Sequence, residues 1–221
     1  MMDYIANLTD LFEKNRNDAN AEPMKKYMKG HFPFLGIKSP GRKMLEGQFF
    51  KENGILKEPL NWEFVFGLWA KEEREYQYTA LVYLEKSLKK LQKDDLVFLE
   101  KLITTKSWWD TVDALAPKPV GTISLNFPEV IAETIDTWAN HENLWLRRAA
   151  ILFQLKYKQN TNEKILYQYI LKNAESKEFF IQKAIGWALR EYSKTKPASV
   201  KAFIESHILA PLSVREGSKY V

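Results

Sequence analysis

The sequence predicts an all-α protein built of consecutive antiparallel helix pairs, and three observations support this prediction. Apolar residues recur at three- and four-residue spacing in nearly every segment, as on one face of a helix. Only 9 Gly and 9 Pro occur in 221 residues, which is few for a turn-rich β fold. Four alanines suited to close helix contacts are spaced 34, 35 and 35 residues apart, namely Ala80, Ala114, Ala149 and Ala184.

The helix pairs can be placed in order along the chain. The second helices begin near four residues: Glu73, Ser107, Asn143 and Ser176. The first helices of the pairs cover residues 94–104, 127–140, 162–174 and 197–207. Pairs that recur every roughly 30–45 residues are typical of HEAT or armadillo solenoids, which bend into a concave groove. We therefore expect one repeat domain over residues 1–221, with the helices of residues 1–60 capping the repeats.

Composition excludes several classes of site. The chain has no Cys, so disulfides, thiolate metal sites and a Cys nucleophile are absent. The three His lie in separate segments, and no Gly-rich phosphate loop or GxSxG motif is present. We therefore expect no metal and no cofactor. The chain starts without a signal-peptide pattern and has no apolar run near ~18 residues, so we expect a cytoplasmic, soluble monomer without a membrane partner.

Positive charge is concentrated in the last third of the chain. Residues 141–221 hold 14 Lys and Arg against 7 Asp and Glu, whereas the first 140 residues hold 19 and 21. A one-sided basic surface favours a phosphate backbone as partner, although many basic faces are only solvated.

The segment Lys106–Asp113 combines two adjacent tryptophans with two carboxylates. We expect Ser107 to be the N-cap of a helix, with Asp110 in its first turn at the positive end of the helix dipole. Residues four apart share a helix face, so Trp109 and Asp113 should point the same way and could hold a cation. The alternative is a capped core helix in which both tryptophans are packed inside.

The repeat spacing extends this face over three successive repeats. Asp113, Arg148 and Lys183 occupy equivalent positions, and on a buried face they would be costly unpaired charges. We therefore expect them on the solvent-lined, concave side. Trp187 follows Lys183 by four residues, so Trp109, Asp113, Arg148 and Trp187 should converge in one cleft. Its basic margin would be extended by Lys156 and Arg190.

Three segments carry a family resemblance: residues 106–113 (KSWWDTVD), 144–158 (LWLRRAAILFQLKYK) and 176–190 (SKEFFIQKAIGWALR). They resemble the signature segments of the AlkD family, bacterial DNA glycosylases that act on alkylated bases. The likeness extends to residues 22–28 (EPMKKYM) and 31–37 (HFPFLGI). The resemblance implies a HEAT-like superhelix that binds duplex DNA in its groove and catalyses without base flipping. The substrates it implies are N7-alkylguanine and N3-alkyladenine.

The resemblance also implies roles for single residues. Asp113 matches the catalytic carboxylate, and Trp109 and Trp187 match the aromatic walls of the lesion cleft. Arg148 matches the arginine that grips the DNA backbone, and Tyr27 matches a tyrosine near the lesion. Lys156, Lys183 and Arg190 are expected to add affinity for the backbone. Relatives continue with another helix where this chain ends, so any DNA contact from that helix is in doubt.

Two other classes of function remain open from the sequence. A non-catalytic DNA-binding solenoid needs the basic face but not Asp113. A protein-binding HEAT scaffold would bury Trp109 and Trp187 in its core and keep Asp113 away from any groove.

Overall fold

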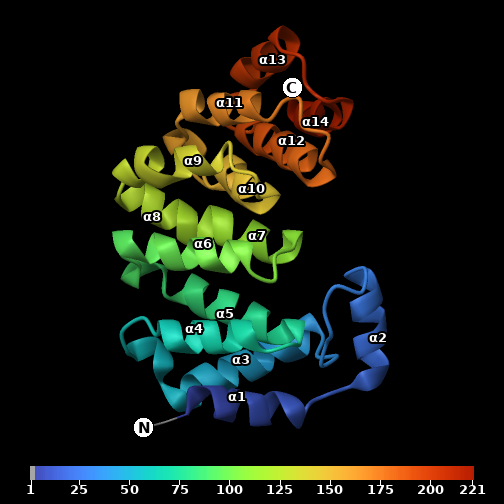
Figure 1. The fold of residues 1–221 in the computed structure, drawn as a ribbon, viewed down its shortest axis with the longest axis vertical. Helices are drawn as coiled ribbons and strands as arrows, with labels where there is room; N and C mark the ends of the chain where they lie inside the picture. Colours follow the sequence, from blue (N-terminus) through green and yellow to red (C-terminus); the bar gives the residue numbers. More distant parts are fainter. Residues whose placement is uncertain (1–2) are drawn as a thin grey trace. The chain divides into compact units, whose positions relative to one another are not determined.

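The computed structural model describes residues 3–221, and all regular secondary structure within this range is helical (Figure 1). The predicted all-α fold of consecutive helix pairs is therefore confirmed. The chain forms two compact units, one up to Lys90 and one from Leu91 onward, which are described separately. The expectation of one repeat domain capped by residues 1–60 stays a prediction.

The first unit consists of α-helices joined by turns and by a longer loop between α2 and α3 (Figure 1). Its described helices are α1 (Tyr4–Glu13), α2 (Asp18–Tyr27), α3 (Ser39–Asn53), α4 (Trp62–Ala70) and α5 (Arg74–Lys86), with single 3-10 turns at Ile55–Lys57 and Leu88–Lys90. Asn61 caps α4 by accepting from the amide of Phe64 at 2.8 Å.

A buried carboxylate fixes the loop between α2 and α3. Glu75, on α5, is fully buried and accepts the backbone N–H groups of Leu35, Gly36 and Ile37 at 3.0, 2.9 and 3.1 Å. Gly36 has φ +83°, and an added Cβ would lie 1.9 Å from the backbone oxygen of Asn17. The carboxylate thus replaces the regular hydrogen bonds that this buried loop lacks.

The second unit, described over residues 91–221, contains nine α-helices. Its helices are α6 (Leu96–Thr104), α7 (Trp109–Leu115), α8 (Gly121–Asn126), α9 (Asp136–Trp138), α10 (Leu144–Leu152), α11 (Glu163–Lys172), α12 (Phe179–Ser193), α13 (Pro197–Ser206) and α14 (Pro211–Gly217). π-helical turns at Ala116–Val120 and Ile131–Ile135 precede α8 and α9, and 3-10 turns lie at Lys93–Asp95, Lys158–Asn160 and Ser218–Tyr220. The predicted repeat positions are buried at Ala149 and Ala184, whereas Ala114 is only half-buried.

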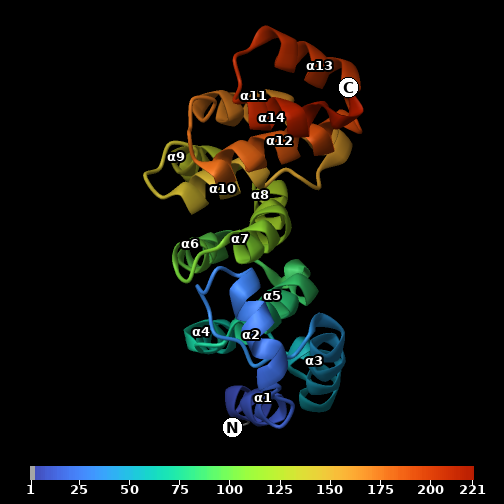
Figure 2. The same cartoon turned by 90° about the vertical axis from the view of Figure 1, so that its right-hand side faces the viewer.

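Helices α7 and α8 form one rod through the π-helical turn between them (Figure 2). This turn contains Pro117 and Pro119, whose nitrogens cannot donate to the carbonyls of Asp113 and Leu115. A widened turn accommodates such missing bonds, and turns of this kind are frequent at functional sites. Asp113 therefore lies on the last regular turn before the widened segment.

The predicted N-cap at Ser107 is wrong. Helix α7 starts at Trp109, and the Ser107 hydroxyl instead donates to the backbone oxygen of Ile103 at 2.6 Å, at the end of α6. Lys106 has φ +50° and Trp108 is extended, so the connecting loop uses both residues before the helix begins. Asp110 does lie in the first turn of α7, where the helix dipole favours a carboxylate.

Candidate functional site

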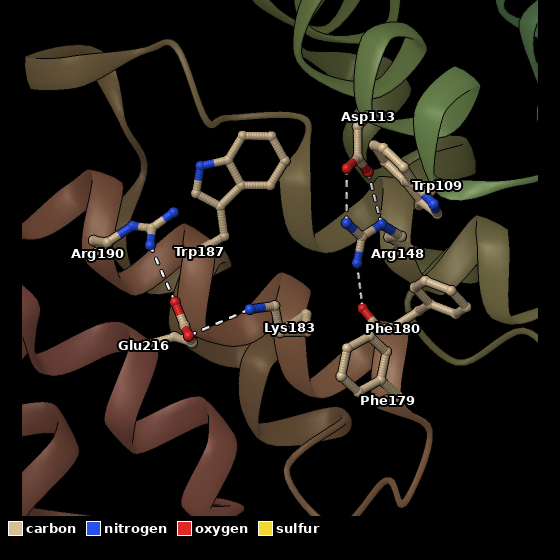
Figure 3. A pocket seen from close by; sticks show the side chains of 9 residues that line it. All are labelled: Trp109, Asp113, Arg148, Phe179, Phe180, Lys183, Trp187, Arg190 and Glu216. Carbon is tan, nitrogen blue, oxygen red and sulfur yellow. Dashed lines mark hydrogen bonds and ion pairs between the residues drawn. The ribbon is translucent and has the colours of Figure 1, made fainter. Parts of the chain in front are cut away.

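The centre of the site is an ion pair between Asp113 on α7 and Arg148 on α10 (Figure 3). The Arg148 Nε lies 2.7 Å from Asp113 Oδ1, and Arg148 Nη2 lies 2.8 Å from Oδ2, which makes the pair bidentate. The remaining guanidinium nitrogen donates to the backbone oxygen of Phe180 at the start of α12. Three helices therefore fix one carboxylate.

This pair corrects the prediction that all three repeat charges face solvent. The Arg148 side chain is 5% exposed and that of Asp113 is 17% exposed, so Arg148 is buried and balanced by its partner. Burial raises the pKa of Asp113 above its usual range, and the hydrogen bonds and charge of Arg148 oppose that rise. A permanently charged guanidinium bound to both oxygens favours the ionised form of the carboxyl.

A second set of charges lies on α12 and α14 (Figure 3). Lys183 Nζ and Arg190 Nη1 lie 3.3 and 3.1 Å from the two carboxylate oxygens of Glu216. Lys219 Nζ is a third partner at 2.9 Å. Hydrogen bonds from Lys219 and Lys183 lower the pKa of Glu216 to about 2. The predicted basic margin is therefore an ionic network that contains a carboxylate.

Aromatic side chains line the space between these two sets of charges. Trp109 projects from α7 and Trp187 from α12, and both indoles are half-buried. Phe179 is 57% exposed at the same pocket. Behind it, Phe180 packs against Trp108 and Trp145 with ring centroids 5.0 and 5.1 Å apart. Trp108 thus packs between helices, while Trp109 lines the pocket.

These groups enclose a pocket of about 280 Å³ in the second unit. It is lined by nine residues, six of which the sequence had singled out: Trp109, Asp113, Arg148, Lys183, Trp187 and Arg190, together with Phe179, Phe180 and Glu216. Sequence reasoning missed the last three. The adjacent Phe179 and Phe180 were a usable signal at the start of a predicted helix, whereas Glu216 pairs with residues distant in sequence and had no local signal.

Two predicted residues lie elsewhere. Lys156 is exposed after the end of α10 and does not line the pocket. Tyr27 ends α2 in the first unit and is 71% exposed. Their predicted contacts with DNA stay predictions.

Residues 3–221 contain neither a cluster of metal ligands nor a membrane-spanning helix. No group of three or more His, Cys, Asp or Glu side chains in this range could hold a metal ion. None of the helices in the same range is long and apolar enough to cross a membrane.

Comparison with known proteins adds a family and a related structure. A family model described as DNA alkylation repair enzyme matches residues 8–221. A solved structure of a predicted DNA alkylation repair enzyme from Enterococcus faecalis is 36% identical, with a TM-score of 0.85. The match covers 93% of this chain and 96% of that one. Comparison with curated proteins gave no significant match.

Proposed function

The chain belongs to the family of DNA alkylation repair enzymes, and from this premise we propose that it is a DNA glycosylase for positively charged alkylated purines. Its reaction would be hydrolysis of the N-glycosidic bond of N7-alkylguanine or N3-alkyladenine in duplex DNA. The observation that carries the proposal is the Asp113 carboxylate, which is fixed by Arg148 in a pocket walled by Trp109 and Trp187.

The chemistry of a cationic purine suits this pocket. Alkylation gives the base a formal positive charge, so the glycosidic bond breaks without an acid and its electron pair neutralises the departing base. Positive charge then develops on the deoxyribose, which becomes oxocarbenium-like before water adds to its C1′ atom. A fixed carboxylate at Asp113 stabilises that charge where it forms and orients the attacking water. Each indole face contributes about 0.5–2 kcal/mol of attraction to the cation.

The contacts of Arg148 suggest its role in the proposed reaction. Of its five N–H groups, one on each of three nitrogens is engaged by Asp113 or by the backbone of Phe180. Its first role is therefore to orient Asp113 and keep it ionised. The phosphate contact implied by the resemblance would use the two remaining N–H groups.

Lys183 and Arg190 provide the contact with the DNA backbone at the pocket, since both are partly exposed at its edge. The half-buried indoles leave part of each side chain open to a lesion that stays in the duplex, which supports catalysis without base flipping. Selection then depends on the charge and lability of the lesion, so neutral lesions are poor substrates.

The alternatives fit these contacts less well. A protein-binding scaffold would have buried both indoles and kept Asp113 away from the pocket, but all three line it. A non-catalytic DNA-binding protein would need no fixed carboxylate among its phosphate-binding cations.

The proposal is tested by release of bases under single-turnover conditions. Duplex DNA containing 7-methylguanine should lose that base rapidly with the wild-type protein, while duplexes containing uracil or hypoxanthine should remain intact. Similar rates for charged and neutral bases would contradict selection by charge. Duplex binding without release of any base would favour the non-catalytic alternative.

A further inference from the structure

Glu216 occupies an unusual position in the pocket. Its carboxylate has one oxygen near Lys183 and the other near Arg190, which lie two helical turns apart on the same face of α12. Trp187 lies between these two cations on that face, so the two cations that contact Glu216 flank the indole (Figure 3). A basic DNA-binding surface gains nothing from an acid by charge alone.

Side-chain contacts and the packing of α14 both place this carboxylate beside α12. The Glu216 side chain is 12% exposed. Lys219, in the 3-10 turn that follows α14, contacts the carboxylate at 2.9 Å. Helix α14 packs on α12 at Gly186, where an added Cβ would lie 2.5 Å from the Cβ of Glu216. Ser213 on α14 also donates to the backbone oxygen of Gln182 on α12 at 3.0 Å. The close packing of α14 on α12 therefore places the backbone and Cβ of Glu216 beside the two cations.

We propose that Glu216 is a positioning residue that holds Lys183 and Arg190 as a two-cation binding site for one DNA backbone phosphate beside Trp187. The inference rests on the proposed function, because it takes DNA as the ligand, and it names the site at which the backbone is held. The carboxylate stays in place when the phosphate binds.

The contacts favour positioning over masking. Glu216 takes one contact from each cation, while an ammonium has three N–H donors and a guanidinium has five. The Lys183 and Arg190 side chains remain 38% and 27% exposed, so donors are left for a phosphate. The three groups together carry one net positive charge. Holding two long cationic side chains in advance removes much of the entropy that a phosphate would otherwise cost to order them.

The test compares two substitutions that change the net charge equally. Glu216→Gln keeps the side-chain shape but can no longer hold both cations. Glu205→Gln is the matched control, because Glu205 lies on α13, is 65% exposed and has its cation, Lys201, at 4.0 Å. Affinity for an unmodified duplex oligonucleotide is measured by fluorescence anisotropy over a range of salt concentrations, and thermal unfolding checks that each variant is folded.

Glu216→Gln should weaken duplex binding about fivefold, although it makes the protein more positive, and should reduce the salt slope by about one. Glu205→Gln should leave the slope unchanged. In a Lys183→Gln background the effect of Glu216→Gln should shrink, because the two residues act together.

Each contrary result has its own meaning. The positioning role is overturned if Glu216→Gln binds duplex DNA more tightly than the wild type, or as tightly as Glu205→Gln. It is also overturned if Glu216→Gln has a lower unfolding temperature but binds duplex DNA as tightly as Glu205→Gln. If the wild-type protein binds duplex DNA but releases no 7-methylguanine, the glycosylase proposal fails, and the comparison of the two variants still decides the role of Glu216. A wild-type protein that does not bind duplex DNA overturns both.

Discussion

Substitution of Arg148 by Gln should move the acidic limb of the pH–rate profile to higher pH. In the wild-type protein, burial raises the pKa of Asp113 and the bidentate contact with Arg148, at 2.7 and 2.8 Å, opposes that rise. Gln cannot supply the charge, so the pKa of Asp113 rises further. A neighbouring arginine lowers a carboxyl pKa by about 1–3 units, and the limb should shift upward by a similar amount.

The sign follows from the reaction. The proposed catalysis needs an ionised Asp113, so the rate falls as pH drops through the pKa of this carboxyl. In Arg148→Gln that loss begins at higher pH, and activity recovers when the medium is made more alkaline. The variant should also be less stable at neutral pH by about 3–5 kcal/mol, since one partner of a buried pair is removed. Thermal unfolding measures that cost separately.

The assay is single-turnover release of 7-methylguanine at a series of pH values, with saturating protein. Lys183→Gln is the matched control, because it removes a positive charge from the same pocket but its contact is with Glu216 rather than Asp113. That control should bind DNA more weakly without a shift of the limb. A folded Arg148→Gln protein whose limb coincides with that of the wild type would refute the reasoning. A loss of equal size at every pH would instead indicate a phosphate contact.

Three further predictions follow from the structure. Replacing Trp109 or Trp187 by Leu should slow release of 7-methylguanine by up to about 30-fold each, the equivalent of about 2 kcal/mol of lost cation–π attraction; unchanged rates would exclude the indoles from the reaction. Gly186→Ala should lower the free energy of unfolding by about 1–3 kcal/mol, because α14 must move. Gly47→Ala, where nothing lies within 4 Å of the added Cβ, should not destabilise α3. Equal unfolding temperatures for the two variants would contradict the close packing at Gly186. Glu75→Gln should cost about 1–3 kcal/mol by leaving buried backbone N–H groups without acceptors, and protection of those amides from hydrogen exchange should fall; unaltered protection would mean that the loop does not depend on the carboxylate.

The sequence predicts those features that depend on neighbouring residues. A helix begins near Asn143 as the sequence predicts, and the Asn143 side chain caps it, because an Asn side chain reaches the amides of the first turn in any tertiary context. The repeat spacing also brings Asp113, Arg148 and Lys183 to one pocket, since equivalent positions of stacked pairs share a face.

Features that depend on distant residues are beyond such reasoning. The sequence placed Arg148 in solvent because no pattern in it shows that the guanidinium reaches Asp113 on another helix. Glu216 was missed for the same reason, since its position depends on how closely α14 approaches Gly186. Ser107 fails as an N-cap because the loop after α6 takes a left-handed residue at Lys106, which delays the start of the next helix.

The central claim is that the Asp113 carboxylate performs the hydrolysis. The most direct measurement is single-turnover release of 7-methylguanine by Asp113→Asn, with duplex binding recorded on the same samples. Asp110→Asn is the matched control, as it makes the same change one helical turn earlier on α7 at a residue that does not line the pocket. The account predicts that Asp113→Asn binds duplex DNA but releases base about 100- to 1,000-fold more slowly, while Asp110→Asn keeps the wild-type rate. Full activity in a folded Asp113→Asn protein would contradict it.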